Sequence, residues 1–237
     1  MKILVVNDDS VSAPGIAALA RAAARFGDVT VVAPSEQCSA LSQKLTLRET
    51  MLLKKYPGFP APVRDVWELS GTPVDCVRIG SFHILAEKPD WVFSGINNGY
   101  NVGFDIAYSG TLGAAFEASR AGIPAIAFSV AGEKHLDAIE PYLIDVIREL
   151  IASHPGEEHV WNVNFPPMAT KPFMGILRDR SVARTSMYHG SYAEECLPDG
   201  SRVLSCVGVP TPDEELGEGT DAAAVRGGDI SVGKVRR

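Results

Sequence analysis

The chain has 237 residues, of which 46% are hydrophobic and 22% are charged, and this is enough apolar material for one large core. The formal net charge of −7 excludes the broad basic surface that binds nucleic-acid polymers nonspecifically. Aspartates at positions 8 and 9 come too early for a signal peptide, and no stretch approaches the roughly 20 apolar residues of a membrane helix. The four cysteines form no CxxC pair and are expected to be reduced. We therefore expect a soluble, cytoplasmic protein that contacts no membrane.

Short β-branched runs alternate with helical patterns over the first 166 residues, which is typical of βα units around a parallel sheet. The first helical pattern begins at Pro14 and ends at Gly27, and Thr72-Pro73 supplies a cap and a first-turn proline for the second. We predict strands at 2–6, 28–33, 63–69, 90–94, 123–129 and 160–165, and further helices at 74–85, 111–121 and 136–153. The strand at 160–165 is expected to close the sheet. The predicted fold class is α/β, with a doubly wound, mostly parallel, Rossmann-like sheet.

The pattern changes after Pro166-Pro167, where Gly, Pro and acidic residues become frequent and helical periodicity disappears. Strands such as 202–209 are isolated there. We therefore divide the chain into an α/β catalytic core, 1–166, and a C-terminal β-rich extension, 167–237. The extension is either an arm that packs on the core or on another subunit, or a partly disordered tail. Its aromatic and β-branched content favours an oligomerisation arm.

Polar side chains follow three of the predicted strands. They occupy residues 7–10 (NDDS), 35–39 (SEQCS) and 94–101 (SGINNGYN). The carboxyl ends of parallel strands share one edge of a sheet, so these three loops can converge. Their carboxylate, hydroxyl and amide oxygens suit Mg²⁺ or Mn²⁺. Since adjacent residues of a strand point to opposite faces, the alternative is that one of Asp8 and Asp9 is a ligand and the other caps a helix.

Residues 108–115 (YSGTLGAA) lead from two hydroxyls and a glycine directly into a helix, whose free backbone N–H groups can bind an anion. The alternative is that Ser109 or Thr111 is an ordinary N-cap. Beside a cation, such a helix end would complete a phosphate site. Other phosphate-handling architectures are excluded, because the sequence has no GxxxxGK[ST] and no GxGxxG after the first strand. A receiver domain would need a further aspartate between Val29 and Arg64, where none occurs.

Taken together, these motifs resemble the SurE family of stationary-phase survival proteins, which are metal-dependent nucleotidases. The matching segments are ILVVNDD and APGI within 3–16, VTVVAP at 29–34, KLTL at 44–47, SGTPVDCV at 70–77, PDWVFSGINNGYNVGFDIAYSGTLGAAFEA at 89–118, NVNFP at 162–166 and GTDAAAVRGGDISVGK at 219–234. The resemblance implies one divalent ion per subunit, Mg²⁺ or Mn²⁺, with four ligands: Asp8, Asp9, Ser39 and Asn97. It implies a phosphate pocket formed by Asn101, Ser109, Gly110 and Thr111. It also implies a homodimer or homotetramer that partly exchanges C-terminal elements.

The activity implied by the resemblance is that of a hydrolase, a 5′-nucleotidase acting on nucleoside monophosphates, and it extends to 3′-nucleotides and short polyphosphate. We expect in-line attack of water on a metal-bound phosphate, with Asp8 and Asp9 as the catalytic residues. Direct attack by either carboxylate is less favoured, since a cation-bound carboxylate is a poor nucleophile. We expect Thr111 to donate to the substrate, and valine at Gly110 to block phosphate while metal affinity survives. The alternative is a non-catalytic protein that senses a nucleotide or a metal.

Five positions depart from the family pattern. Ser10 and Ala40 stand where glycine is usual, so a backbone angle that glycine adopts easily is expected to be strained or altered. Asp229 and Gly233-Lys234 replace an aromatic residue and a Thr-Pro pair. These changes bear on substrate fit and subunit packing more than on metal binding. The aromatic residues near the site, which are Tyr100, Phe104 and Tyr108, either stack on a base or pack in the core.

Overall fold

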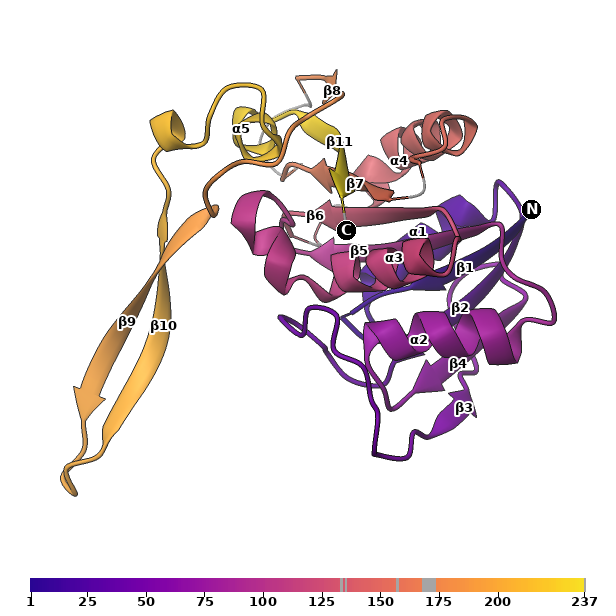
Figure 1. Cartoon of the computed structure of the whole chain (residues 1–237), viewed down its shortest axis with the longest axis horizontal. Helices are drawn as coiled ribbons and strands as arrows, with labels where there is room; N and C mark the ends of the chain where they lie inside the picture. Colours follow the sequence, from indigo (N-terminus) through magenta and orange to yellow (C-terminus); the bar gives the residue numbers. More distant parts are fainter. Residues whose placement is uncertain (133, 135, 157, 168–173, 237) are drawn as a thin grey trace.

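The computed structural model describes residues 1–132, 134, 136–156, 158–167 and 174–236. In this part of the chain, nine strands form one mixed sheet with the order β3-β4-β2-β1-β5-β6-β7-β11-β8 (Figure 1). The strands of the sheet are β1 Lys2–Val6, β2 Asp28–Pro34, β3 Leu53–Lys55, β4 Asp65–Leu69, β5 Trp91–Asn98, β6 Ala125–Val130, β7 His159–Phe165, β8 Ile176–Leu177 and β11 Ile230–Arg236. The six strands from β4 to β7 run parallel, which confirms the predicted α/β class.

Helices cover both faces of the sheet. The pair α1 Pro14–Ala23 and α4 Leu136–Ala152 lies on one face, and α2 Pro73–Ile79 with α3 Gly110–Arg120 lies on the other (Figure 1). Alternate residues of β1 enter the two cores: Ile3 and Val5 pack with α1 and α4, whereas Leu4 and Val6 pack with α2 and α3. Burial on both faces explains why the central strands are continuous apolar runs rather than alternating ones.

The N-terminal boundaries follow the local signals closely. The Thr72 hydroxyl accepts a hydrogen bond from the backbone N–H of Asp75, and the Asp75 side chain accepts one from the backbone N–H of Thr72, so this helix begins with a complete capping box. The predicted helix over 74–85 is α2 followed by a π-helical turn, Gly80–Ile84. Gly80 lies so close to β1 that a Cβ on it would stand 2.8 Å from the Leu4 side chain. The short edge strand β3 was missed in the sequence.

Two expectations for the C-terminal segment are wrong. The strand at 160–165 does not close the sheet, because β11 pairs antiparallel with β7 and β8 pairs with β11. Helical structure does not end at Pro167 either, since α5 spans Asp221–Gly227, begins with Thr220 as its N-cap and ends at the left-handed Gly228. This helix is too short for a periodic apolar pattern, so only its capping residues could have indicated it. The division of the chain at residue 166 stays a prediction.

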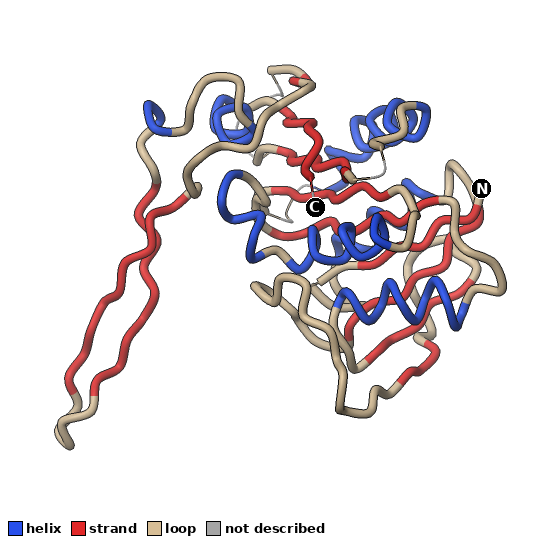
Figure 2. Tube along the Cα trace, viewed as in Figure 1, coloured by secondary structure: helices blue, strands red, loops and turns tan. Residues whose placement is uncertain are grey.

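The remaining two strands form a separate antiparallel hairpin, β9 Tyr188–Cys196 with β10 Arg202–Pro210. It projects away from the sheet, and every residue of both strands is exposed (Figures 1 and 2). The strand expected at 202–209 is therefore present, paired rather than isolated. No helix in the described part of the chain is long and apolar enough to cross a membrane.

Candidate functional site

Three loops meet at the carboxyl edge of the sheet, as the strand order predicts. Asp8 and Asp9 lie in the loop after β1, and the loop after β2 is tied to them because the Cys38 N–H donates to the Asp8 carbonyl at 2.6 Å. The end of β5 is joined as well, since the backbone N–H of Asn98 donates to Asp9 Oδ2 at 2.9 Å. Gln37 Nε2 lies 3.3 Å from Asp9 Oδ1. The two carboxylates therefore stand at the junction of β1, β2 and β5, on a topological switch point.

The Asp8 carboxylate is almost completely buried. Only 3% of the residue is exposed, and its Oδ1 accepts a hydrogen bond of 2.8 Å from the Thr111 hydroxyl. Burial, followed by the negative charge of Asp9, raises the pKa of Asp8 to about 6. Asp8 is therefore a buried acid beside a second acid, an arrangement that a cation would neutralise.

Ser39 and Asn97, the neutral oxygens of the expected ligand set, lie on two of these loops. Ser39 is exposed one residue after Cys38. Asn97 is half-buried at the end of β5, and its Nδ2 donates to the Gly99 carbonyl at 2.9 Å, which leaves its Oδ1 as the atom suited to a cation. Among the described residues no group of three or more His, Cys, Asp or Glu is placed to hold a metal. A cation here would therefore depend on neutral oxygens in addition to the two carboxylates.

The N-terminus of α3 lies against Asp8. Ser109 is the N-cap and accepts from the Leu112 N–H at 3.1 Å, so it does serve as an ordinary cap. The Thr111 hydroxyl donates to Asp8 and is fully buried, and its contact with a substrate stays a prediction. Gly110 is so close that a Cβ on it would lie 2.9 Å from Asp8 Cβ and 3.1 Å from Oδ2. A side chain at 110 would therefore crowd Asp8 as well as a phosphate, and its effect on metal affinity stays a prediction.

Asn162 and Asn164 of β7 also reach this region, and they were not singled out from the sequence as candidate site residues. Their side chains bind the backbone of Asn101, which accepts from Asn162 Nδ2 at its carbonyl and donates its N–H to Asn164 Oδ1, both at 2.8 Å. The Asn101 side chain in turn donates to Ser129 Oγ of β6 at 2.8 Å. The signal was the Asn-Val-Asn run, because residues two apart on a strand share a face.

Ser10 and Ala40, which replace glycines of the family pattern, both have positive φ angles, 94° and 57°. The backbone thus keeps a glycine-like conformation although the glycine is absent. L-residues adopt such angles at a cost of about 1–2 kcal/mol. The loops after β1 and β2, which carry the candidate ligands, are therefore held in a strained form by their surroundings.

We expect Ser10→Gly to raise the free energy of unfolding by roughly 0.5–1 kcal/mol, because glycine removes the strain but adds freedom to the unfolded chain. Ser12→Gly is the matched control. The Ser10 and Ser12 hydroxyls lie 3.0 Å apart, so both variants lose the same hydrogen bond, but Ser12 is not among the residues with positive φ. Denaturant unfolding should therefore show opposite shifts. Equal destabilisation by both changes would contradict the strain at Ser10.

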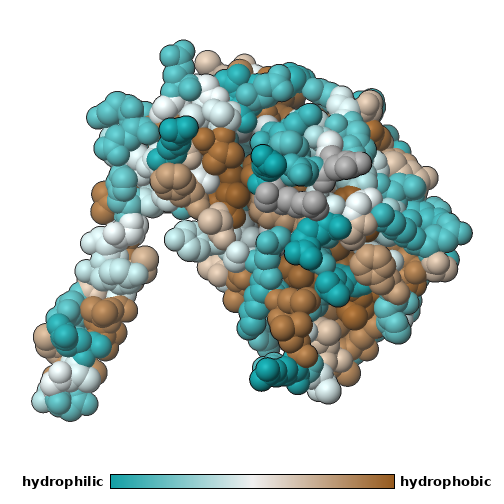
Figure 3. Space-filling view, viewed as in Figure 1, coloured by the Kyte–Doolittle hydropathy of each residue, from teal (hydrophilic) through white to brown (hydrophobic). Residues whose placement is uncertain are grey.

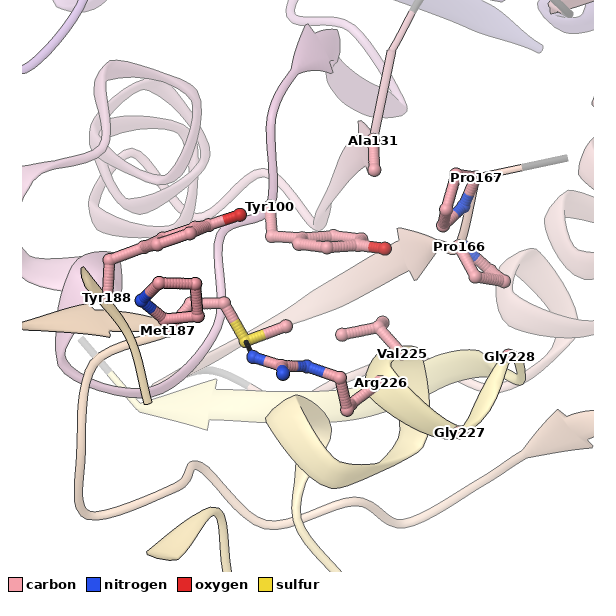
Figure 4. A pocket seen from close by; sticks show the side chains of 11 residues that line it. Tyr100, Ala131, Pro166, Pro167, Met187, Tyr188, Val225, Arg226, Gly227 and Gly228 are labelled. Carbon is pink, nitrogen blue, oxygen red and sulfur yellow. Dashed lines mark hydrogen bonds between the residues drawn. The ribbon is translucent and has the colours of Figure 1, made fainter. Parts of the chain in front are cut away.

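A cavity of about 440 Å³ opens at the same edge of the sheet, beyond the ends of β6 and β7 (Figure 4). Tyr100 and Tyr188 lie next to each other on its wall, and the Arg226 guanidinium lies beside Met187 (Figure 4). Arg226 also pairs with Asp213 at 3.0 Å. Of the three aromatic residues singled out in the sequence, Tyr100 lines this cavity, whereas Phe104 and Tyr108 are largely exposed.

Known proteins resemble this chain over nearly its whole length. The family model described as survival protein SurE matches residues 3–190. The chain is 37% identical to the "5′-nucleotidase SurE" of Laribacter hongkongensis, covering 98% of this chain and 91% of that protein. It is equally identical to the "5′/3′-nucleotidase SurE" of Escherichia coli O127:H6, over 98% and 88%. The crystal structure of the SurE protein from Aquifex aeolicus has a TM-score of 0.85 at 34% identity, covering all of this chain and 93% of that one.

Proposed function

Because the chain belongs to the SurE family, we propose that it is a metal-dependent phosphatase that hydrolyses nucleoside monophosphates. The observation that carries this proposal is the contact between two carboxylates and a helix N-terminus. Asp8, beside Asp9, is bonded to Thr111 in the first turn of α3. A cation held by the carboxylates and an anion held by the helix end would therefore be neighbours, which is the arrangement needed to bind a phosphate.

The residues fit a hard divalent cation such as Mg²⁺ or Mn²⁺. The candidate ligands Asp8, Asp9, Ser39 and Asn97 offer oxygen atoms alone, which suits these ions better than zinc or copper. Burial and the negative charge of Asp9 raise the pKa of Asp8 more than the hydrogen bond from Thr111 lowers it, so a cation bound here would stabilise the ionised carboxylate. We propose one such ion in each subunit. When bound, it would supply positive charge to the phosphoryl oxygens during displacement of the ester.

The other residues of the site orient the phosphate. Gly110 has no side chain, and the N-terminal, positive end of the α3 dipole lies at this side of the site, where it favours an anion. Thr111 fixes the Asp8 carboxylate by its 2.8 Å hydrogen bond. Water then attacks phosphorus in line, the P–O ester bond breaks, and the nucleoside oxygen leaves with a proton. Because Thr111 and the start of α3 are already fixed in place, they can stabilise the charge that develops on the phosphoryl oxygens without having to reorganise.

Hydrolysis of a panel of nucleoside monophosphates and of p-nitrophenyl phosphate, in Mg²⁺, in Mn²⁺ and in EDTA, tests the proposal. We expect turnover with either ion and none in EDTA. Full activity in EDTA would remove the metal from the proposed reaction. Tight binding of a nucleotide without turnover in any ion would favour the alternative, a non-catalytic sensor. The cytoplasmic location stays a prediction that fractionation of cells would test.

The cavity beside Tyr100 supports a place for the nucleoside. Tyr100 is adjacent in sequence to Asn101, so a nucleotide with its phosphate at α3 could extend along the sheet edge toward the two tyrosine rings. A base stacked on an aromatic ring gains about 1–3 kcal/mol. We expect Tyr100→Ala to raise KM for nucleoside monophosphates about tenfold or more and to leave p-nitrophenyl phosphate unchanged. Phe82→Ala, at an exposed aromatic on the π-helical turn, serves as the control. Equal effects on both substrates would argue against a base at Tyr100.

We also propose that the β9–β10 hairpin is an oligomerisation arm in a homodimer or homotetramer. A two-stranded hairpin alone is at best marginally stable in water. This one exposes several large apolar side chains, and hydrophobic surface lies along it in Figure 3. Those with at least half of their surface exposed are Tyr188, Tyr192, Leu204 and Val209. A second copy of the chain would cover this surface.

Light scattering should give at least a dimer for the parent chain and a smaller mass after the hairpin is shortened. The register places Gly190 opposite Gly208, so residues 191–207 can be replaced by an Asn-Gly turn without disturbing the nine-stranded sheet. Removal of the whole end of the chain would instead delete β11. Leu47→Ser, at an exposed leucine outside the hairpin, should not change the mass. A monomeric parent, or an unchanged mass after shortening, would refute the arm.

A further inference from the structure

We infer that Asn162 and Asn164 of β7 are positioning residues that hold Asn101 and, through Thr111, orient Asp8. The inference rests on the proposed function for the identity of the site. Neither asparagine touches the carboxylates. They act on the phosphate site through a continuous set of buried hydrogen bonds that begins on β7 and ends at Asp8, in the loop after β1.

The first part of this set fixes the backbone of Asn101 on both sides. Its N–H donates to Asn164 Oδ1 at 2.8 Å, and its carbonyl accepts from Asn162 Nδ2 at 2.8 Å and from Asn164 Nδ2 at 3.2 Å. The two side chains also bond each other, Asn164 Nδ2 donating to Asn162 Oδ1 at 3.2 Å. All three residues are at least 95% buried. The side chains of β7 thus bond both the backbone N–H and the backbone carbonyl of this loop residue.

The second part continues from the Asn101 side chain. Its Nδ2 donates to Ser129 Oγ at 2.8 Å and lies 3.3 Å from Thr111 Oγ1. The Thr111 hydroxyl in turn donates a hydrogen bond to Asp8 Oδ1. Ser129 and Thr111 have no exposed surface. A displacement of Asn101 would therefore affect Thr111 directly and Asp8 through Thr111, because these hydrogen bonds are buried away from solvent.

The placement of the two asparagines is not required by the strand itself. The backbone of β7 is already paired on both sides, with β6 and with β11. Val160 on the same face belongs to the apolar core under α3, while Val163 points to the opposite core. The strand thus changes from valine to asparagine where it reaches the carboxyl edge. Burying two amides is costly unless they are bonded, and their bonds go to Asn101.

Asn164→Ala, Asn162→Ala and Ser129→Ala test the inference, with Val163→Ala as the matched control. The control removes fully buried volume from the same strand but on the other face, so it should lower the melting temperature and leave the site intact. Four quantities are measured: kcat and KM for p-nitrophenyl phosphate, Mn²⁺ affinity by calorimetry, and the affinity for inorganic phosphate in Mn²⁺. Loss of such supporting residues typically costs about 10–100-fold in metal affinity or activity.

We expect Asn164→Ala to lower kcat/KM and phosphate affinity by about this factor, with smaller losses for Asn162→Ala and Ser129→Ala, which each break fewer bonds to Asn101. Val163→Ala should keep both quantities within about twofold of the parent. Parent-like phosphate and Mn²⁺ affinity in the asparagine variants, or an equal loss in Val163→Ala, would overturn the inference. Should Asn164→Ala not fold, Ser129→Ala decides, because it removes one hydrogen bond and little volume. A parent that binds Mn²⁺ and phosphate without hydrolysing would refute the proposed function, and the binding constants would still decide the positioning role.

Discussion

Asp8→Asn is expected to abolish metal-dependent hydrolysis and at the same time to stabilise the metal-free protein. The change removes one negative charge from the proposed cation site and keeps nearly the same shape, so the hydrogen bond from Thr111 to Oδ1 can persist. Activity in saturating Mn²⁺ should fall by at least about 10²-fold, because Asp8 bears on both the cation and the phosphate.

The gain in stability follows from the sign of the pKa shift. Asp8 has a folded-state pKa of about 6 against the ordinary 3.8, so between these values the folded state binds more protons than the unfolded state. The stability of the metal-free protein therefore falls as pH rises through this window, and the full penalty is present at neutral pH. Asparagine carries no such penalty. We expect a gain of roughly 1–3 kcal/mol for Asp8→Asn at pH 7.

Asp9→Asn separates the two effects. Asp9 is less buried and receives hydrogen bonds from the Asn98 backbone and Gln37, so its replacement should weaken Mn²⁺ binding and hydrolysis without a comparable gain in stability. Thermal unfolding with and without Mn²⁺, calorimetric titration with Mn²⁺ and steady-state kinetics together measure stability, metal binding and hydrolysis. At a free Mn²⁺ concentration of 100 times its Kd, the ion should raise the free energy of unfolding of the parent by about 2.7 kcal/mol, and that of each variant much less. An Asp8→Asn protein with full activity, or one stabilised by Mn²⁺ as the parent is, would contradict the assignment.

Local signals predicted the core of the fold well because its elements carry their own chemistry. The capping residue Thr72, the apolar run of β1 and the Asn-rich end of β5 each define an element or a loop without reference to the rest of the chain. Once the sheet is parallel, the meeting of the loops follows from topology, and Asp8 and Asp9 do lie beside the loops of Cys38 and Asn98.

Contacts between residues far apart in the sequence could not be predicted from local sequence patterns. The pairing of β11 with β7 joins residues some 70 apart, and Asn164 acts on Asn101, 63 residues away. Nothing in the sequence near Thr111 indicates whether its hydroxyl faces a substrate or Asp8; that depends on how α3 is set against β1. The positive φ at Ser10 was predictable only in part. The usual glycine of the family pattern suggested such an angle, and the structure supplies its value.

Gly110→Ala should be nearly as damaging as loss of a carboxylate, although it adds a single methyl group. Gly110 is the first residue of α3 and is not among the glycines with positive φ, so alanine there carries no backbone penalty and has the better helix propensity. The cost comes from space alone. The new Cβ would lie 2.9 Å from Asp8 Cβ, 3.1 Å from Asp8 Oδ2 and 3.2 Å from the Cys38 carbonyl oxygen.

These three atoms cannot move independently. The Cys38 N–H is bonded to the Asp8 carbonyl, and Asp8 Oδ1 is bonded to Thr111 in the same turn of α3, so relief of the contact must shift the carboxylate or the helix end. A misplacement of about 1 Å at a reacting centre can cost about 10²-fold in rate. We therefore expect kcat/KM to fall by about that factor for every phosphate ester, with weaker Mn²⁺ binding and little change in the free energy of unfolding.

Gly175→Ala is the control, because its Cβ would make only an ordinary contact of 3.5 Å, with Asp229. Steady-state kinetics with p-nitrophenyl phosphate and calorimetric titration with Mn²⁺, on both variants, would decide the matter. If Gly110→Ala kept the parent's Mn²⁺ affinity and lost only phosphate binding, the methyl group would be facing the substrate and not Asp8. If it turned over substrate at the parent rate, the start of α3 would be a helix cap and no part of the phosphate site.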